Sequence, residues 1–301
     1  MPIHVKARLR PWRWPGLSLR WVFHQALLRA LRAPRLPHDP PLHQMALRGG
    51  TLSAHRLSTS AGNILAVWLV SPDASGPNAT PTVLVMHGWG SNAAMMWPVV
   101  QPLVDSGHVV ALVDARCHGE SDCNDFTSLP RFAEDISTTL QWLVQQPGVD
   151  IQRMALLGHS VGAGACLLHA AYGEPKVSAV VSLSAFAHPA EVMRRWLTEH
   201  HLPHRGLGAA VLLHVQEVIG ARFDDIAPLH TITKTTVPIL LVHGRQDEAV
   251  PFADAERLAE AAWNAGGYVQ MLGVDGSHDL RKALEPHTHE IVNFLAKVWR
   301  I

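Results

Sequence analysis

The sequence predicts an α/β fold, in which a mostly parallel β-sheet is flanked by helices. The first observation behind this prediction is that short apolar runs alternate with helical patterns over most of the 301 residues. Such alternation is typical of strand–helix–strand units with right-handed crossovers. The second is a G-x-S-x-G pentapeptide at residues 158–162, which lies between an apolar run and a helical pattern. The length suits one large domain or two small ones and is ample for a buried core.

Composition places the chain among globular proteins, because 48% of its residues are apolar and 17% are charged. The formal net charge is zero, which provides no general attraction to nucleic acid. The charge is unevenly distributed, however. Eight of the 25 Lys and Arg residues precede Asp39, which is the first acidic residue. A basic head on an acidic body can indicate a surface-binding arm.

Residues 1–49 are therefore predicted to be a basic, proline-rich extension, and residues 50–301 the folded domain. One helical stretch fits between Leu17 and Arg32, without a clean amphipathic stripe. The extension has three open interpretations: a tether that brings residues 1–35 to an anionic membrane, an organelle transit peptide, or a solvated tail. No apolar run approaches the ~20 residues of a membrane-spanning helix. We expect a cytoplasmic protein with possible peripheral membrane contact and an unknown oligomeric state.

Eight strands are predicted along the domain. Thr51–Ser58 and Ile64–Val70 form a hairpin that turns at residues 61–63. Continuous Val, Leu and Ile runs are typical of strands buried on both faces of a parallel sheet. These runs are Thr82–Met86, His108–Val113, Met154–Leu157, Val177–Leu183 and Pro238–Val242, and Tyr268–Val274 is the expected last strand.

Helical patterns separate the strands, at Ala93–Ser106, Pro130–Gln146, Val161–Tyr172, Phe252–Ala265 and Leu280–Trp299. About fifty residues lie between the strands that end at Leu183 and begin at Pro238. A connection of this length in an α/β fold is usually functional. We predict a small helical lid at about 187–236 that shapes a substrate pocket at the carboxyl ends of the strands, with Leu212 and Val215 on its apolar helix.

The three cysteines are odd in number and fit no zinc pattern, so we expect no disulfide framework and a reducing compartment. Cys166 is expected to be a core residue.

Ser160 is the candidate nucleophile. It lies in the strand–turn–helix context of a nucleophile elbow, and Gly158 and Gly162 supply the room that this tight turn needs. The alternative is a turn serine that caps a helix.

A serine hydroxyl needs a general base, and the chain order expected in this context is Ser, acid, His. His278, after the last strand, is the candidate base. Asp247, after the preceding strand, is the candidate acid, with Glu248, Asp275 and Asp279 as rivals.

An oxyanion hole requires preorganised N–H donors. His87-Gly88-Trp89-Gly90 follows an early strand, so the backbone amides of Trp89 and Val161 are the candidate donors. The alternative is an ordinary glycine turn.

With these motifs in order, residues 50–301 resemble the α/β-hydrolase superfamily, and in particular bacterial serine aminopeptidase-like and prolyl-oligopeptidase-like hydrolases and esterases. The segment from Asp114 to Ser121 resembles the D-x-R-G-H-G-x-S turn of these proteins, with Cys117 in place of a glycine. The resemblance implies an eight-stranded α/β-hydrolase fold, in which Asp114 and Arg116 fix a loop.

The resemblance implies hydrolysis of a carboxylic ester or thioester through an acyl-serine intermediate. The partner is then a small acyl substrate, and neither a metal ion nor an organic cofactor is implied. Two alternatives stay open. One is a peptidase, amidase or acyltransferase on the same triad, and the other is a non-catalytic binding protein on a hydrolase fold.

Overall fold

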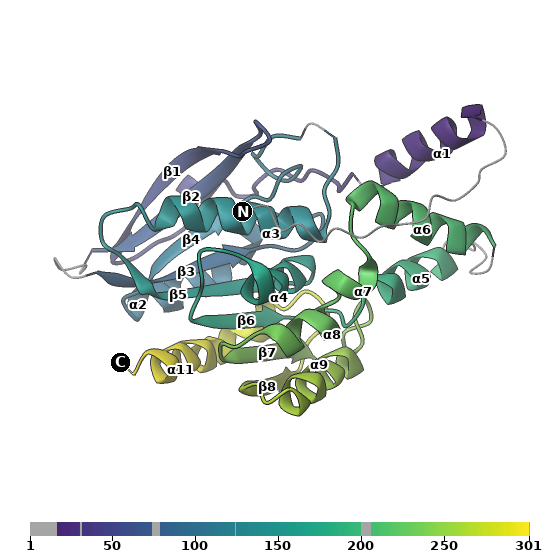
Figure 1. The fold of residues 1–301 in the computed structure, drawn as a ribbon. Coiled ribbons are helices and arrows are strands. Elements are labelled where there is room, and N and C mark those ends of the chain that lie inside the picture. Colours follow the sequence, from purple (N-terminus) through teal and green to yellow (C-terminus); the bar gives the residue numbers. More distant parts are fainter. Residues whose placement is uncertain (1–16, 31, 74–78, 124, 200–205, 301) are drawn as a thin grey trace.

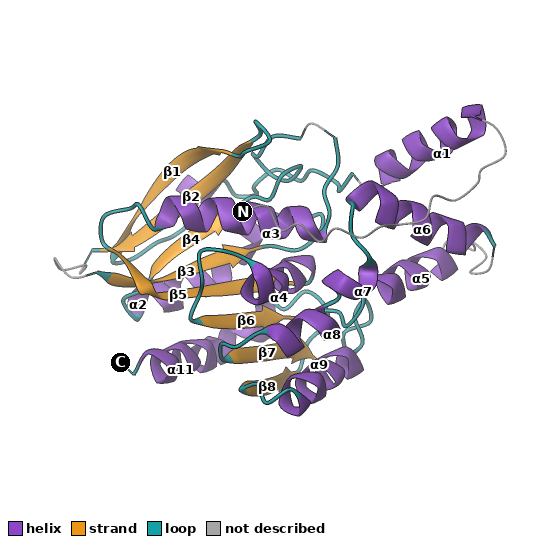
Figure 2. Cartoon of the chain, in the orientation of Figure 1, coloured by secondary structure: helices purple, strands orange, loops and turns teal. Residues whose placement is uncertain are grey.

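The sheet predicted from the sequence is present. The computed structural model describes residues 17–30, 32–73, 79–123, 125–199 and 206–300. Its eight-stranded sheet has helices on both faces (Figure 1; Figure 2) and the order β1-β2-β4-β3-β5-β6-β7-β8. Strand β2 is antiparallel to β1 and β4, and the other neighbours pair in parallel. The strands are β1 (Gly50–Ser58), β2 (Ile64–Pro72), β3 (Thr80–Met86), β4 (Val109–Val113), β5 (Val149–His159), β6 (Ala179–Leu183), β7 (Ile239–Gly244) and β8 (Val269–Val274).

The central strands are apolar throughout because both faces of the sheet are covered. In β3, Leu84 and Met86 join one core, whereas Val83 and Val85 join the core on the opposite face. Successive side chains of a strand point to opposite faces, so a strand covered on both sides needs apolar residues at every position. One face carries α3 (Leu129–Leu143), α4 (Val161–Tyr172) and α9 (Phe252–Asn264), and the other carries η2 (Ala93–Val99), α2 (Val100–Asp105) and α11 (Thr288–Trp299).

The predicted helices are confirmed, with two changes. The expected helix over Ala93–Ser106 begins as the 3₁₀ segment η2, and its α-helical part is Val100–Asp105. The expected helix over Leu280–Trp299 is divided into α10 (Arg281–Leu284), the 3₁₀ turn η4 (Glu285–His287) and α11. Pro286 lies in this turn, and proline lacks the N–H that an uninterrupted helix would require there.

The expected insertion is helical. Between β6 and β7 lie α5 (Pro189–Glu199), α6 (Leu207–Ile219), α7 (Phe223–Ile226), α8 (Pro228–Thr231) and the 3₁₀ turn η3 (Ile232–Lys234). Figure 1 shows α5 and α6 projecting on the same side as α1 (Leu17–Ala30). The Nδ1 atom of His24 on α1 lies 3.2 Å from Nε2 of His214 on α6. Within the described ranges, no helix has the length and apolar character needed to cross a membrane.

The boundary predicted at residue 50 needs correction. Strand β1 does begin at Gly50, but residues before it already belong to the packed domain. Leu42 is buried in the same core as α2, and Trp97 donates its indole N–H to the Ala46 carbonyl at 3.2 Å. The charge and proline content of residues 1–49 did not show this, because packing depends on a few anchoring side chains. Residues 1–16 of the predicted extension lie outside the described residues.

The cysteine expectation was also wrong for one pair, because Cys117 and Cys123 form a disulfide. The turn after β4 brings them together, and the Cys117 amide donates to the Asp122 carbonyl at 2.9 Å. The cysteine count therefore no longer argues for a reducing compartment. Cys166 is free and buried, as expected, and burial raises the pKa of its thiol.

The packing of α3 leads to a stability prediction. Leu140 is fully buried in the core on its face of the sheet, whereas the next residue, Gln141, is exposed. We expect Leu140→Ala to lower the free energy of unfolding by about 2–5 kcal/mol through lost burial and a residual cavity. Gln141→Ala is the matched control and should change it by less than about 0.5 kcal/mol. Urea denaturation followed by circular dichroism measures both, and equal effects would contradict this packing of α3.

Candidate active site

The turn that carries Ser160 connects β5 to α4 and is strained. Ser160 has φ 52° and ψ −116°, a backbone conformation that residues other than glycine rarely adopt. The surrounding contacts hold it there. Its amide donates to the Leu183 carbonyl at 2.8 Å, and a Cβ on Gly162 would lie 2.3 Å from the His87 carbonyl oxygen. The two glycines of the motif are therefore required by close backbone packing, and they let Ser160 stand at the carboxyl end of the sheet.

The structure brings the three predicted site residues together in one hydrogen-bonded chain. The Nε2 atom of His278 lies 3.0 Å from Ser160 Oγ, and Nδ1 of His278 lies 2.8 Å from Asp247 Oδ2. Ser160, Asp247 and His278 follow β5, β7 and β8, which are parallel strands that end at the same edge of the sheet. Ligand and catalytic sites in open α/β sheets typically lie at this edge.

Asp247 is held as a carboxylate. Its side chain is buried, and Oδ1 accepts hydrogen bonds from the amides of Ala249 at 3.0 Å and Val250 at 2.7 Å. Burial acts to raise the pKa of Asp247, but hydrogen bonds from His243, His278 and the Val250 amide outweigh it, so the pKa is lowered. A carboxylate only accepts hydrogen bonds, so Nδ1 of His278 carries the proton, and Nε2 of a neutral ring is left to accept from Ser160.

The rival acids do not occupy this position. Glu248 and Asp275 are exposed, and Asp279 is exposed and paired with Arg281. Asp247 is thus the acid that contacts His278.

The loop after β3 lies directly against the serine turn. A Cβ on Gly88 would lie 3.2 Å from the Ser160 Cβ, so the next residue, Trp89, is beside the serine and lines the same cavity. Val161 follows Ser160 as the first residue of α4. Both predicted donor residues are therefore close to Ser160, and their role in holding an oxyanion belongs to the proposal below.

Two buried histidines support this loop, and sequence reasoning did not single them out for it. His87 accepts from the Ala115 amide through Nε2 and contacts the Gly88 carbonyl through Nδ1, while His118 accepts from the Gly90 amide at 3.1 Å. Burial lowers the pKa of His87, and burial with the neighbouring His87 lowers the pKa of His118 to about 3. Both rings are therefore neutral near pH 7, and each can accept an amide N–H. Among 20 histidines, no sequence signal marks these two for this role.

A third histidine, His159, supports the predicted base. Its Nε2 lies 2.8 Å from the carbonyl oxygen of His278, and burial together with the His278 ring lowers its pKa to about 4. A neutral His159 that donates through Nε2 ties the backbone of the His278 loop to the end of β5.

A cavity of about 200 Å³ opens beside Ser160 and His278. Its apolar lining comes from two short segments and β6, and consists of Met95, Met96, Pro98, Val99, Leu183, Leu280 and Leu284 together with Trp89. The charged pair Asp279 and Arg281 also lines it.

The predicted role of the lid is therefore wrong for this cavity, because no described residue of 187–236 lines it. Leu212 and Val215 are buried in the core instead. The apolar residues of α6 pack against the domain. Composition alone does not distinguish residues that pack in a core from residues that line a cavity.

Comparison with known proteins agrees with the fold and the motif order. Residues 77–220 match the family described as serine aminopeptidase, S33. An uncharacterized protein of Mycobacterium tuberculosis, Rv2307c, is 30% identical over 243 residues, which are 80% of this chain and 79% of that protein. The uncharacterized protein YfhR of Escherichia coli K12 is 26% identical over 204 residues, 67% of this chain, and the match spans 65% of the length of YfhR.

Solved structures show the same fold at low identity. Esterase Pf2001 of Pyrococcus furiosus superposes with a TM-score of 0.70 at 18% identity, covering 89% of this chain and 97% of that one. Acetyl xylan esterase 1 of a Thermoanaerobacterium species superposes with a TM-score of 0.64 at 16% identity, covering 94% and 93%. Dipeptidyl peptidase 4 of Porphyromonas gingivalis gives 0.62 at 18%, covering 84% and 36%. With the family match, the M. tuberculosis relative and the eight-stranded sheet all in agreement, the chain belongs to the serine aminopeptidase (S33) family of α/β-hydrolases.

Proposed function

We propose that this protein is a serine hydrolase that cleaves carboxylic esters or thioesters of small acyl groups. The observation that carries the proposal is the hydrogen-bonded chain from Ser160 through His278 to the buried carboxylate of Asp247. A serine hydroxyl is a weak nucleophile until a base removes its proton, and this chain supplies the base together with the acid that orients it.

In the proposed reaction, His278 Nε2 takes the hydroxyl proton while Ser160 Oγ attacks the substrate carbonyl carbon. The charge that develops on the carbonyl oxygen is held by the backbone amides of Trp89 and Val161. His278 then gives its proton to the leaving alcohol or thiol, and the acyl group stays on Ser160. A water molecule, deprotonated by the same ring, releases the acid and restores the serine.

The cavity favours a small acyl group. Sites for drug-sized ligands measure about 300–1,000 Å³, so the 200 Å³ beside Ser160 suits a short acyl chain. Its methionine and leucine side chains favour an apolar acyl group, and the only charged residues among the described residues that line it, Asp279 and Arg281, are already paired with each other.

Cleavage of a peptide or amide, or acyl transfer to an acceptor other than water, would use the same groups, and a solved neighbour of this fold is a dipeptidyl peptidase. A non-catalytic binding role would leave the serine unreactive. Parallel assays with p-nitrophenyl esters, acyl thioesters and aminoacyl p-nitroanilides separate the substrate classes.

The membrane tether stays a separate prediction. Within α1, Trp21, Val22 and Arg29 are exposed, and side chains of these types occur on interfacial helices, although α1 lacks the clean amphipathic stripe of such a helix. The four Lys and Arg residues before position 17 lie outside the described residues.

Removal of the nucleophile is the first functional test. Ser160→Ala should reduce kcat for a p-nitrophenyl ester by at least about 10³-fold and abolish labelling by a fluorophosphonate probe. Ser277→Ala, at an exposed serine next to His278, is the control and should keep both properties. Labelling that persists in Ser160→Ala at another serine would contradict the assignment, and absence of labelling in the wild type would favour the non-catalytic alternative.

The second test concerns the acid. Asp247→Asn should lower kcat by about 10³- to 10⁴-fold, because the amide can no longer hold His278 in the tautomer that accepts from Ser160. Asp275→Asn, at an exposed acid three residues before His278, should stay close to the wild type. A larger loss in Asp275→Asn than in Asp247→Asn, measured on the same ester, would show that the acid has been assigned to the wrong residue.

The third test concerns the cavity wall. Leu284→Phe should lower kcat/KM for butyrate and octanoate esters relative to acetate by about 10-fold or more, because each displaced methylene is worth about 1–3 kcal/mol. Leu213→Ala, at an exposed position of α6, is the control for the insertion and should leave the chain-length preference unchanged. A preference that changes only in the α6 variant would restore the predicted role of the lid.

A further inference from the structure

The segment from Pro34 to His38, here called the strap, crosses the loop that follows β3. Pro34 lies against Gly90, since a Cβ on that glycine would lie 3.0 Å from Pro34 Cγ. Two residues further along the loop, the side-chain amide of Asn92 donates to the carbonyls of Leu36 at 3.1 Å and Pro37 at 3.0 Å. The strap therefore contacts both sides of the turn that begins at Trp89.

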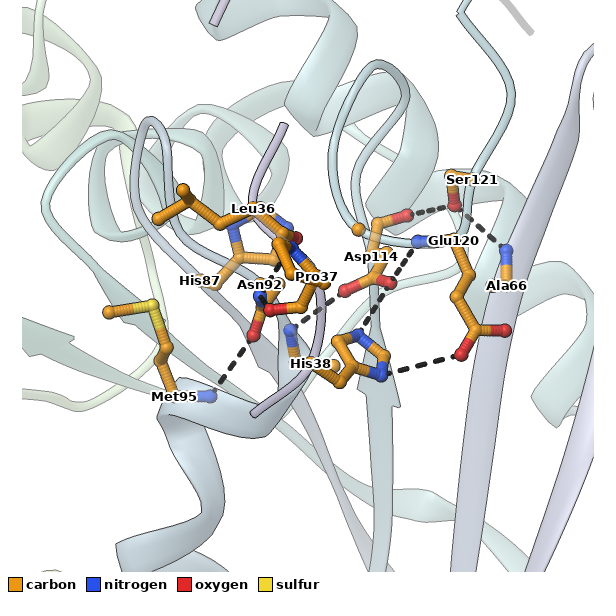
Figure 3. A network of polar contacts seen from close by, with 12 residues as sticks. Leu36, Pro37, His38, Ala66, His87, Asn92, Met95, Asp114, Glu120 and Ser121 are labelled. Carbon is orange, nitrogen blue, oxygen red and sulfur yellow. Dashed lines mark hydrogen bonds and ion pairs between the residues drawn. The ribbon is translucent and has the colours of Figure 1, made fainter. Parts of the chain in front are cut away.

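His38 attaches the strap to a second loop. Its side chain is 3% exposed, and its Nε2 lies 2.9 Å from Oδ2 of Asp114, at the end of β4 (Figure 3). Its Nδ1 faces the Glu120 carboxylate at 3.5 Å. One edge of the ring packs against Trp68, with centroids 4.8 Å apart. These contacts are too specific and too buried for a solvated tail.

Asp114 connects His38 back to the loop after β3. Its Oδ1 accepts from the Ala93 amide at 2.7 Å, and its Oδ2 also accepts from the Glu120 amide at 2.7 Å (Figure 3). Burial acts to raise the pKa of Asp114, but the hydrogen bond from His38, the His38 charge and the hydrogen bond from the Glu120 amide outweigh it, so the pKa is lowered. A carboxylate with no exposed surface thus joins the strap, the loop after β3 and the turn after β4.

Asn92 has two roles that can be separated. Its amide nitrogen donates to the strap, while its Oδ1 accepts from the Met95 amide at 3.3 Å and caps the helical turn η2 (Figure 3). The loop from Gly88 to Ala93 is consequently held by the strap through Gly90 and Asn92, and by Asp114 through Ala93.

We propose that the strap positions the backbone of the Trp89 turn for oxyanion binding, with His38 as the positioning residue that fastens it to Asp114. This inference rests on the proposed function, because it assigns a role to the strap in the reaction at Ser160. Trp89 immediately precedes Gly90, which Pro34 contacts, and it lies three residues before Asn92. A loosened strap therefore displaces the Trp89 amide before it disturbs the triad. Displacement of an oxyanion donor lowers kcat, whereas substrate binding in the cavity is largely retained.

The ionisation of His38 gives the proposal a pH signature. Burial acts to lower the pKa of His38, but its hydrogen bond to Asp114 and the charges of Asp114 and Glu120 outweigh it, so the pKa is raised. The carboxylates of Asp114 and Glu120 face His38, with His87 on the far side of Asp114 and Arg56 paired with Glu120 at 2.9 Å. Because the pKa is raised, the charged contact contributes fully at low pH and is lost as the pH rises through the pKa of His38.

The main variant is His38→Leu, which removes the donor and keeps an apolar side chain against Trp68. We expect kcat for an acetate ester to fall by about 10-fold or more, with KM changed by less than about 3-fold, since loss of an entire oxyanion donor costs about 10²- to 10³-fold. His38→Gln keeps an N–H donor and should recover part of the loss. His43→Leu, at an exposed histidine five residues further on, is the matched control and should behave as the wild type.

The kcat of the wild type divided by the kcat of His38→Gln should be largest at low pH, and this ratio should decrease as the pH rises above the pKa of His38. Each ratio is taken at a single pH, so any effect of pH on the triad, which both proteins share, cancels. A ratio that is constant across the pH range would contradict the charged contact.

Hydrogen exchange measured by mass spectrometry provides a readout without activity. In His38→Leu, peptides covering residues 87–97 should exchange faster, while peptides covering β7 at residues 239–244 stay as in the wild type. If His38→Leu fails to fold by thermal unfolding, His38→Gln and Asn92→Asp carry the same measurements, because Asn92→Asp removes the donor to the strap and keeps the acceptor for Met95.

A folded His38→Leu with kcat within about 2-fold of the wild type, or with unchanged exchange over 87–97, would overturn the proposal. A failure of the proposed function would give a different experimental result. The wild type itself would then show neither ester turnover nor fluorophosphonate labelling, whatever the exchange of the strap variants.

Discussion

The close contact between the loop after β3 and the turn at Ser160 is the constraint on which the rest of the site depends. Side chains larger than hydrogen do not fit at Gly162, where a Cβ would meet the His87 carbonyl at 2.3 Å, or at Gly158, where it would meet the Gly162 carbonyl at 2.5 Å. The contact keeps Ser160 in a strained conformation and brings Trp89 beside it. Strain of this kind persists where surrounding structure over-determines it, and here the parallel strands on both sides supply that support.

The surroundings of each ionisable group near the serine decide whether that group is charged or neutral. Asp247 and Asp114 stay ionised because several N–H groups donate to each carboxylate. Burial is the largest influence on the pKa values of His87, His118 and His159, and it lowers all three, so these rings are neutral. A neutral imidazole can accept an amide N–H, as His87 and His118 do at the loop after β3, whereas His159 donates to the His278 carbonyl.

The two helical layers have different parts in the architecture. The face with α3, α4 and α9 also packs the insertion, through residues such as Leu212 and Val215. The face with η2, α2 and α11 carries Met96, Val99, Leu280 and Leu284, which reach the cavity at the carboxyl edge of the sheet. The cavity beside Ser160 is thus a continuation of the second core, and the N-terminal strap lies at the end of the same layer, where it contacts the loop before η2.

The sequence by itself determined the α/β fold, its eight strands, and the positions of Ser160, Asp247 and His278 at strand ends, since periodicity and the motif at 158–162 are local properties. Tertiary structure decided what depends on distant contacts. These contacts are the disulfide between Cys117 and Cys123, the docking of His38 on Asp114, and the cavity wall at Leu280 and Leu284 in place of the insertion. Residues far apart in the chain show no common pattern in the sequence until the fold brings them together. Composition therefore predicted that residues 1–49 are an extension, although the segment from Pro34 to His38 contacts the loop after β3 and Asp114.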